Sequence, residues 1–320
     1  MNNSELIVEL KKLIDLKLDP LITSDYILLD LPYHKNIGDT LIWQGELNYL
    51  KLKPYRCLGY SNKDTFQFPN LSPDVLILLN GGGNFGDLYR SSQEFRCNVI
   101  SRYQRNKILM FPQSVYYQDT NLIFKDSKIL NNHSNLYLCA RDYPSYQFMR
   151  QYFCKNHVLL VPDMAFYVDL KSDEDNLGEK SKNLYFKRAD KESVSELVKR
   201  QELKDNDHVG DWPTFEKTYF RVFLLYLALA VYRRLPKWVF GRETMAKMID
   251  IFAAYFVKDF LIKLGVGFIA PYSDIKVDRL HGLILSFLMG KNIAYQDNST
   301  GKVSAFVSTW LRDAKEIKKL

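Results

Sequence analysis

The chain has 320 residues, of which 47% are hydrophobic and 25% are charged, a composition that excludes extensive disorder and favours two domains over one. Its formal charge of +7 suits anionic ligands, while the lack of a basic stripe interleaved with aromatic residues argues against nucleic acid as a partner. The four cysteines form no C-x-x-C pair, so we expect reduced, mostly buried thiols, with neither a disulfide framework nor a zinc site.

The N-terminal segment predicts a helix rather than a signal peptide. Acidic residues stand where a signal peptide needs a basic start, and no continuous apolar stretch follows them. Leu6, Leu10, Leu13 and Ile14 instead fall on one helical face. We therefore expect a cytoplasmic protein.

In the first half of the chain, short apolar runs alternate with longer amphipathic ones. The amphipathic patterns at Thr40–Lys51 and Tyr143–Phe153 predict helices. This alternation is typical of an α/β fold with a mainly parallel sheet, in which ligands bind beyond the carboxyl ends of the strands. The apolar runs that predict strands are Tyr26–Asp30, Asp74–Leu79, Lys107–Phe111, Leu136–Ala140 and Val158–Val161.

The polar and charged segment Lys171–Lys182 predicts a linker between two domains. We therefore assign residues 1–172 to an N-terminal α/β domain and residues 183–320 to a C-terminal one. The strands predicted for the second domain are Asn183–Lys187, Val266–Ala270, Lys276–Asp278 and Asn292–Tyr295.

Residues 214–264 predict an apolar helical insert in the second domain. Its uncharged run Val222–Tyr232 is too short to span a bilayer, which requires ~20 residues. A buried core helix explains this run, but the flanking Arg221 and Arg233 also suit a helix lying peripherally at the inner membrane face. The C-terminal pattern Val303–Leu320 predicts a packed surface helix.

The segment His34–Asp39 follows the first predicted strand and precedes a helix. Gly38 would permit a tight turn and Asp39 or Thr40 could cap the helix, so a simple connection explains these residues without a ligand. That explanation does not account for the three polar residues His34, Lys35 and Asn36 at the carboxyl end of the strand.

The segment Asn80–Asp87 contains three adjacent glycines directly after another predicted strand. Such a loop allows a ligand to approach the backbone, and its exposed N–H groups can bind an anion. The spacing matches neither a dinucleotide fingerprint nor a P-loop. A flexible loop without a binding role is the alternative.

Polar residues also follow three further strands, at Phe111–Ser114, Arg141-Asp142 and Pro162-Asp163. Asp142 could pair with Arg141, and Asp163 could cap a turn. Each feature alone is a weak signal, but their recurrence at strand ends predicts one polar rim of the sheet.

Arg279 and His281 form the sharpest candidate site. Because they are two residues apart, their side chains would point the same way in an extended segment. A guanidinium binds carboxylate or phosphate by paired hydrogen bonds, and the N-terminus of the helix that follows also favours an anion. Lys302 adds another cation after the next strand, although a structural role for a histidine beside an arginine remains the alternative.

These motifs, taken in order, resemble the polysaccharide pyruvyl transferase family. The one departure is Met164, which stands where the family has a small residue after Pro-Asp. The resemblance covers most of the chain outside residues 214–264, through Asn36-x-Gly38-Asp39, Gly81-Gly82-Gly83, Arg141-Asp142, Pro162-Asp163, Arg279-Leu280-His281 and Gly290 to Lys302.

The resemblance implies two Rossmann-like domains that face each other across a cleft, as in glycosyltransferases of the B type. It implies phosphoenolpyruvate as the donor and a sugar of a polysaccharide or its lipid-linked precursor as the acceptor. The donor would be bound by Arg141, Arg279, Leu280, His281 and Lys302. The acceptor side would comprise Asn36, Gly38, Asp39, Gly82, Gly83 and Asn84.

For the ketal-forming reaction that the resemblance implies, His281 is the candidate general acid and Asp39 the candidate general base. No cluster of histidine, cysteine and carboxylate residues has ligand spacing, so no metal and no cofactor beyond the co-substrate phosphoenolpyruvate is expected.

Two other functions fit the same sequence. A sugar-nucleotide-dependent glycosyltransferase of the same fold would use the cations for a diphosphate leaving group. A non-catalytic subunit of a polysaccharide assembly complex would use residues 214–264 as a partner surface. The acceptor itself stays open between a sugar on polyprenyl pyrophosphate, an oligosaccharide and a nucleotide sugar.

Overall fold

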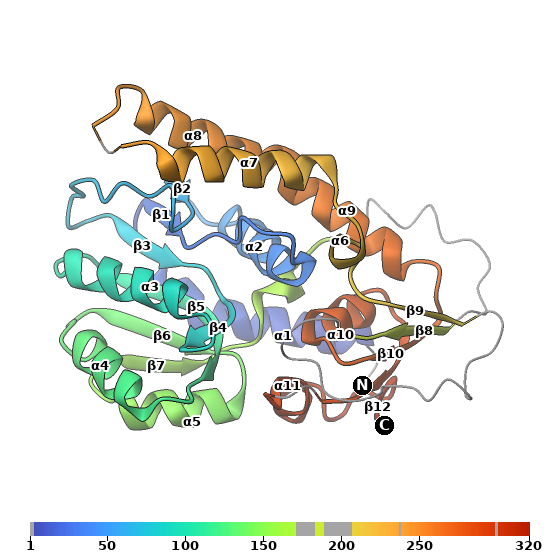
Figure 1. The fold of residues 1–320 in the computed structure, drawn as a ribbon. Helices are drawn as coiled ribbons and strands as arrows, with labels where there is room; N and C mark the ends of the chain where they lie inside the picture. Colours follow the sequence, from blue (N-terminus) through green and yellow to red (C-terminus); the bar gives the residue numbers. More distant parts are fainter. Residues whose placement is uncertain (1–2, 171–182, 189–206, 237, 298–299) are drawn as a thin grey trace.

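The computed structural model describes residues 3–170, 183–188, 207–236, 238–297 and 300–320 (Figure 1). The predicted linker Lys171–Lys182 lies outside the described residues, so the assignment of domains remains a prediction. Within the described part of the chain, the strands form two separate sheets, and every strand pairing in them is parallel. The predicted α/β class with parallel sheets is therefore confirmed.

The first sheet has seven strands in the order β2-β1-β3-β5-β6-β7, with β4 paired to β5. All five strands predicted for the first half of the chain are present, whereas β2 and β4 were not predicted. Strand β2 is partly exposed and β4 is rich in glycine, so neither carries an apolar run. The strands are β1 (Tyr26–Leu29), β2 (Cys57–Ser61), β3 (Leu76–Leu79), β4 (Gly82–Gly86), β5 (Ile108–Tyr116), β6 (Leu136–Ala140) and β7 (His157–Leu160).

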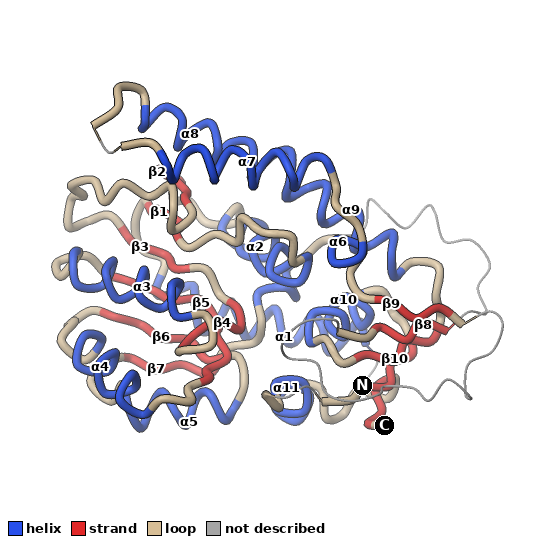
Figure 2. Tube along the Cα trace, viewed as in Figure 1, coloured by secondary structure: helices blue, strands red, loops and turns tan. Residues whose placement is uncertain are grey.

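Helices cover this sheet and link its strands (Figure 2). The N-terminal helix buries Leu6, Leu10 and Ile14 as predicted, with Leu13 half-buried beside them. The helices of this part are α1 (Asn3–Leu18), α2 (Ile37–Leu50), α3 (Arg90–Arg102), α4 (Thr120–Leu130) and α5 (Tyr143–Tyr152), with the short 3-10 turns η1 (Asp19–Leu21) and η2 (Met164–Tyr167).

The second sheet has five strands in the order β12-β11-β10-β8-β9. The predicted helix Val303–Leu320 is wrong beyond Trp310, because the chain leaves the helix there and returns to the sheet as β12. The elements are β8 (Asn183–Phe186), β9 (His208–Gly210), β10 (Asp274–Val277), α10 (Leu280–Leu288), β11 (Asn292–Tyr295), α11 (Lys302–Trp310) and β12 (Ile317–Lys319).

The helical content predicted for residues 214–264 is present, but the strand predicted at Val266–Ala270 is wrong. That run continues a helix in which Leu261, Val266 and Ile269 are buried on one face, so helical packing overrides its strand-like composition. The helices are α6 (Pro213–Glu216), α7 (Phe220–Arg234), α8 (Arg242–Phe252), the π-helical turn η5 (Ala253–Val257) and α9 (Lys258–Ile269).

Helices α7 and α8 form an antiparallel pair that lies over the β2 edge of the first sheet (Figure 1). Asp250 of α8 fastens the pair there, because its carboxylate accepts hydrogen bonds from Tyr33 (2.8 Å), Ser61 (3.1 Å) and Thr65 (2.6 Å). Within the described residues, no helix is long and apolar enough to cross a membrane.

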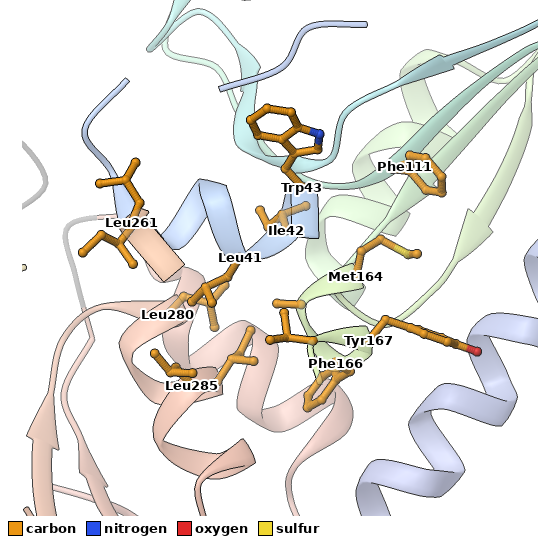
Figure 3. Packing of buried hydrophobic residues seen from close by; sticks show 14 of the residues in the cluster. Leu41, Ile42, Trp43, Phe111, Met164, Phe166, Tyr167, Leu261, Leu280 and Leu285 are labelled. Atoms are coloured by element: carbon orange, nitrogen blue, oxygen red, sulfur yellow. The ribbon is translucent and has the colours of Figure 1, made fainter. Parts of the chain in front are cut away.

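Helix α2 lies between the two sheets and is buried on most of its surface (Figure 3). Its Leu41 lies beside Leu285 of α10, and one hydrophobic cluster includes residues of both sheets. On its other side, α2 approaches η2 so closely that a Cβ built on Gly45 would lie 1.8 Å from the carbonyl oxygen of Met164. The two sheets are therefore joined through one packed helix.

Each sheet reverses its strand order at one point, between β1 and β3 in the first sheet and between β8 and β10 in the second. At such a point the connections after the two strands run in opposite directions, which leaves a crevice at their carboxyl ends. Both crevices open toward one pocket.

Candidate active site

A pocket of about 360 Å³ lies where the connections of the two sheets meet. It brings together nine of the predicted site residues, while Gly38 and Gly82 lie behind its surface. The lining residues are His34, Lys35, Asn36, Asp39, Lys63, Gly83, Asn84, Tyr89, Ser91, Ser92, Arg141, Arg188, Trp212, Phe215, Arg279, Leu280, His281 and Lys302.

The pocket is strongly cationic. Its described lining includes six lysine or arginine residues, drawn from both sheets, and a single carboxylate, Asp39. Fixed cations in a partly enclosed site attract anions far more strongly than the same charges do in water. The arrangement is therefore built for a ligand with several negative charges.

Arg141, directly after β6, is buried and held by two neighbours. Its Nε donates to Ser114 Oγ at 2.8 Å and one Nη donates to Asp163 Oδ2 at 2.8 Å. The alternative in which Asp142 pairs with Arg141 does not apply, because Asp142 caps α5 by accepting from the Ser145 N–H at 2.9 Å. The second Nη of Arg141 points at the glycine segment, since a Cβ built on Gly83 would lie 2.8 Å from it.

His281 Nε2 lies beside the ion pair that Arg141 forms with Asp163. It is 3.2 Å from an Nη of Arg141 and 3.4 Å from Asp163 Oδ2. Although burial alone would raise the pKa of Asp163, His281 and Arg141 together hold that pKa well below its usual value. The Asp163 carboxylate therefore stays charged and orients the imidazole, besides capping η2 as predicted.

Gly38 has a different role from the one predicted. Helix α2 begins at Ile37 and is capped by Asn36, whose Oδ1 accepts from the Gly38 N–H at 3.1 Å, so the predicted caps Asp39 and Thr40 are wrong. A Cβ on Gly38 would lie 2.7 Å from His281 Nδ1. The glycine is therefore required for the close approach of α2 to the histidine.

Arg279 has extended backbone and directly precedes α10 without a side-chain capping hydrogen bond, whereas His281 lies inside the helix. The two residues therefore do not share an extended segment, but they open a helix as predicted, and both side chains line the pocket. Arg279 makes a two-pronged ion pair with buried Asp211 and lies 4.8 Å from the centre of the Phe215 ring. Lys35 lies 4.7 Å from the same ring, so Phe215 helps to hold two cations of the site.

His34 and Asp39 form a pair at the more open side of the pocket. His34 Nδ1 accepts from the Asn36 N–H at 3.3 Å, which leaves Nε2 to carry the proton toward Asp39 Oδ2, 3.6 Å away. Asn36 Nδ2 donates to the same carboxylate at 2.7 Å. The His34 and Asp39 side chains are 43% and 26% exposed, so the pair can reach a ligand.

The glycine segment Asn80–Asp87 is an ordered part of the site and not a flexible loop, because it forms β4 and is held by hydrogen bonds at several points. The Gly81 N–H donates to Glu46 at 2.7 Å, and Lys302 Nζ donates to the Gly83 carbonyl at 3.0 Å. Burial raises the pKa of Glu46 well above its usual value, and the hydrogen bond from the Gly81 N–H only partly opposes this rise. Arg96, paired with Asp30 at 2.6 Å, donates to the Asn84 carbonyl at 3.2 Å.

A smaller alcove of about 60 Å³ continues the pocket toward the crevice between β1 and β3. It shares His34 and Asp39 with the pocket and adds buried Asp30 and Asn80. The Oδ1 atom of Asn80 is buried without a hydrogen-bond partner among the described residues. The alcove thus offers oxygen atoms that could accept hydrogen bonds from the hydroxyl groups of a ligand.

Some lining residues were not found from the sequence. Trp212 follows β9, which is only three residues long, so no strand signal marked its carboxyl end. Arg188 follows the predicted strand β8 but belongs to no motif that the sequence singled out. Lys63 follows the unpredicted β2. Among the described residues, no three histidine, cysteine or carboxylate side chains gather as metal ligands would.

The four cysteines are free thiols. Cys97 and Cys139 are buried, as expected, but Cys57 and Cys154 are exposed.

Known proteins resemble this chain along most of its length. Residues 36–295 match the model of the polysaccharide pyruvyl transferase family. The chain is 31% identical over 292 residues to "Putative pyruvyl transferase EpsO" of Bacillus subtilis, with 90% of this chain and 86% of that protein covered. It is 27% identical over 301 residues to "Pyruvyl transferase 1" of Schizosaccharomyces pombe, covering 89% and 69% of the two chains.

The fold also has a counterpart among solved structures. An uncharacterised Klebsiella pneumoniae protein, KP1_0663, matches with a TM-score of 0.67 at 18% identity, and the match covers 97% of this chain and 98% of that one. At this level of identity the likeness shows a shared fold.

Proposed function

This chain belongs to the polysaccharide pyruvyl transferase family, as its motifs predict, and we propose that it transfers the pyruvyl group of phosphoenolpyruvate to two hydroxyls of one sugar. The products would be a cyclic ketal and inorganic phosphate. The observation that carries this proposal is the pocket with six lysine or arginine residues and one carboxylate. We further propose that the two sheets belong to two Rossmann-like domains facing each other as in B-type glycosyltransferases.

The donor is assigned to the cations at the buried end of the pocket. Phosphoenolpyruvate carries a carboxylate and a phosphate on adjacent atoms, so it needs two anion sites close together. Arg141 and Lys302 both approach Gly83, which places a guanidinium and an ammonium side by side. Arg279 and the N-terminal N–H groups of α10, which begins at Leu280, provide the second site.

His281 is proposed as the general acid that protonates the methylene carbon of the donor. Its Nε2 can donate to Asp163 when the ring is protonated and accept from Arg141 when it is neutral. The site therefore accommodates the ring before and after it gives up a proton. Protonation leaves C2 electrophilic, and the first sugar hydroxyl then forms a bond to C2.

Asp39, beside His34, is proposed as the general base that takes the proton of the attacking hydroxyl. The C2–O bond to phosphate then breaks and the phosphate leaves with its electron pair. The second hydroxyl closes the ring and loses its own proton. Overall, one proton ends on the methyl carbon and the other on the phosphate or the base, so the reaction needs no oxidant or reductant.

The acceptor is assigned to the open side, where Asn36, Asp39, Gly83 and Asn84 line the pocket and the alcove continues it. Gly38 and Gly82 support this side from behind. We propose a sugar of a polysaccharide or of its lipid-linked precursor as the acceptor.

The acid and base assignments predict losses of turnover without loss of donor binding. His281→Gln and Asp39→Asn should each lower phosphate release in the presence of acceptor by about 10²–10⁴-fold, the usual contribution of general acid–base catalysis. The phosphoenolpyruvate-induced rise in melting temperature should persist. Near-normal turnover in either variant would remove that residue from its role.

Donor binding is tested by the melting temperature with and without phosphoenolpyruvate, next to a panel of nucleotide sugars. A ligand at about 100 times its dissociation constant adds about 2.7 kcal/mol to the free energy of unfolding. We expect phosphoenolpyruvate to raise the melting temperature and Lys302→Met to abolish that rise. The matched control is Lys291→Met, because Lys291 is equally buried and donates to the Ala270 carbonyl at 3.0 Å but does not line the pocket.

The control variant should retain the response to phosphoenolpyruvate. A rise with nucleotide sugars alone would contradict the proposal and favour the glycosyltransferase. No response to any of these ligands would also count against it.

A further inference from the structure

Helix α7 is apolar on two opposite faces. One face, which includes Leu225 and Leu229, is buried against the molecule, as expected for a core helix. The other face is exposed and repeats at helical spacing. Its side chains are Phe220 (72% exposed), Phe223 (49%), Leu227 (49%) and Val231 (44%).

The exposed apolar surface continues beyond α7. The connection to α8 carries Trp238 and Phe240, which are 85% and 104% exposed. Helix α8 and the turn η5 add Met248, Ile251 and Tyr255, also exposed and one helical repeat apart. We call the exposed side chains between residues 220 and 255 the α7–α8 surface. Large aromatic side chains left in water in this number mark an interaction site.

The charges around this surface are predominantly positive. The described part of residues 220–257 contains five lysine or arginine residues and two acidic ones, and one of the five, Arg233, pairs with Asp64 of the first sheet's connections. One of the acidic residues, Asp250, is buried against the first sheet. Arg234 and Lys247 are exposed among the apolar side chains. This combination of exposed aromatic and aliphatic residues with a positive surplus complements an anionic lipid surface.

The α7–α8 surface is also connected to the rim of the pocket. The hydroxyl of Tyr226 in α7 accepts a hydrogen bond from the backbone N–H of Lys35 at 2.9 Å. Thr214 at the start of the same helical region donates to the Lys35 carbonyl at 2.6 Å. Lys35 lines the pocket. Any external surface to which α7 docks would therefore lie next to the pocket entrance.

We propose that the α7–α8 surface docks on an anionic membrane, with Trp238 and Phe240 inserted at the level of the lipid headgroups. An amphipathic segment that lies in the interface needs only one exposed apolar face and basic neighbours, and α7 has both. The docking itself does not depend on the donor chemistry. Its use, which is to bring the pocket to a lipid-linked sugar, rests on the proposed function.

The test is co-sedimentation of the full chain with vesicles of phosphatidylcholine alone or mixed with phosphatidylglycerol, at low and high salt. We expect binding to the anionic vesicles that weakens as salt rises. The double variant Trp238→Ala/Phe240→Ala should bind the anionic vesicles at least about tenfold more weakly than the unmodified chain, because two large apolar side chains are removed.

The matched control is Phe124→Ala, which removes an aromatic side chain that is 64% exposed on α4, on another part of the molecule. It should bind vesicles as the unmodified chain does. The phosphoenolpyruvate-induced rise in melting temperature, measured on all variants, reports the pocket independently, so failure of docking and failure of the donor proposal are distinguishable.

Three results would overturn the proposal. The first is no binding to anionic vesicles at low salt, and the second is equal binding by the double variant. The third is a dimer in solution that dissociates in the double variant while no form binds vesicles, because the surface would then join two copies of the chain.

Discussion

Gly38 and His281 show how single residues connect the two halves of the site. Gly38 lies in the first turn of α2 and His281 in the first turn of α10, and the ring packs directly on the glycine. A side chain at position 38 would displace the imidazole from Asp163 and Arg141. The glycine therefore sets the position of the proposed acid although it does not line the pocket.

Gly38→Ala is expected to lower the free energy of unfolding by about 1–3 kcal/mol, the usual cost of forcing a methyl group into a packed site. It should also reduce turnover, because the histidine must move. The control is Gly267→Ala in α9, where a Cβ meets nothing within 4 Å. That change should stabilise the protein by about 0.5–1 kcal/mol, since alanine favours a helix. Denaturant unfolding measures both, and unchanged stability in Gly38→Ala would contradict the packing argument.

At the scale of elements, the attachment of α8 to the first sheet depends on one buried carboxylate. Burial raises the pKa of Asp250 to about 6, and the hydrogen bonds from Thr65, Tyr33 and Ser61 only partly oppose this rise. Because the pKa in the folded state exceeds that of an unfolded aspartate, the folded state holds this proton more tightly. The stabilisation by protonated Asp250 is therefore complete below about pH 4 and is lost as the pH rises through 6.

Comparison with Asp250→Asn isolates this effect. The difference in free energy of unfolding between the unmodified chain and the variant should fall by roughly 2–3 kcal/mol between pH 4 and pH 7. Denaturant unfolding at several pH values measures it. Asp25→Asn is the control, since hydrogen bonds from Arg56 lower the pKa of this partly exposed aspartate, and no such fall is expected. A difference that stays constant with pH would contradict the assignment.

The elements that could be predicted from the sequence are those whose pattern of apolar residues is complete within one short segment. Strand β6 was predicted with its exact bounds because Leu136–Ala140 is a continuous apolar run between polar segments. Strand β4 could not be found, because its glycines pair with β5 only in the folded chain. The run Val266–Ala270 suits either a strand or a helix, and its contacts within α9 decide between them.

At the scale of the whole molecule, the polar rim was predictable because parallel strands end at the same edge of a sheet. Arg141, Arg279 and Lys302 were found in this way. Their partners were not, because Asp211 and Phe215 reach Arg279 only through the tertiary fold. Sequence reasoning thus identified the ligand-facing cations but not the groups that position them.

The convergence of two sheets on one pocket explains why cations so far apart in the sequence act together. The connections after β6 of the first sheet and β10 of the second supply Arg141 and Arg279, and α2 packs between the sheets. A ligand that contacts both sets of cations therefore stabilises the relative position of the two sheets. A ligand with one anionic group can contact only part of this set.

Calorimetric titration of the purified chain with phosphoenolpyruvate, pyruvate, inorganic phosphate and a nucleotide sugar tests the central claim most directly. We predict one binding site for phosphoenolpyruvate, with an affinity at least about tenfold higher than for pyruvate or phosphate, because only the complete donor engages both anion sites. Tight binding of the nucleotide sugar with no heat from phosphoenolpyruvate would contradict the assignment of the pocket to a pyruvyl donor.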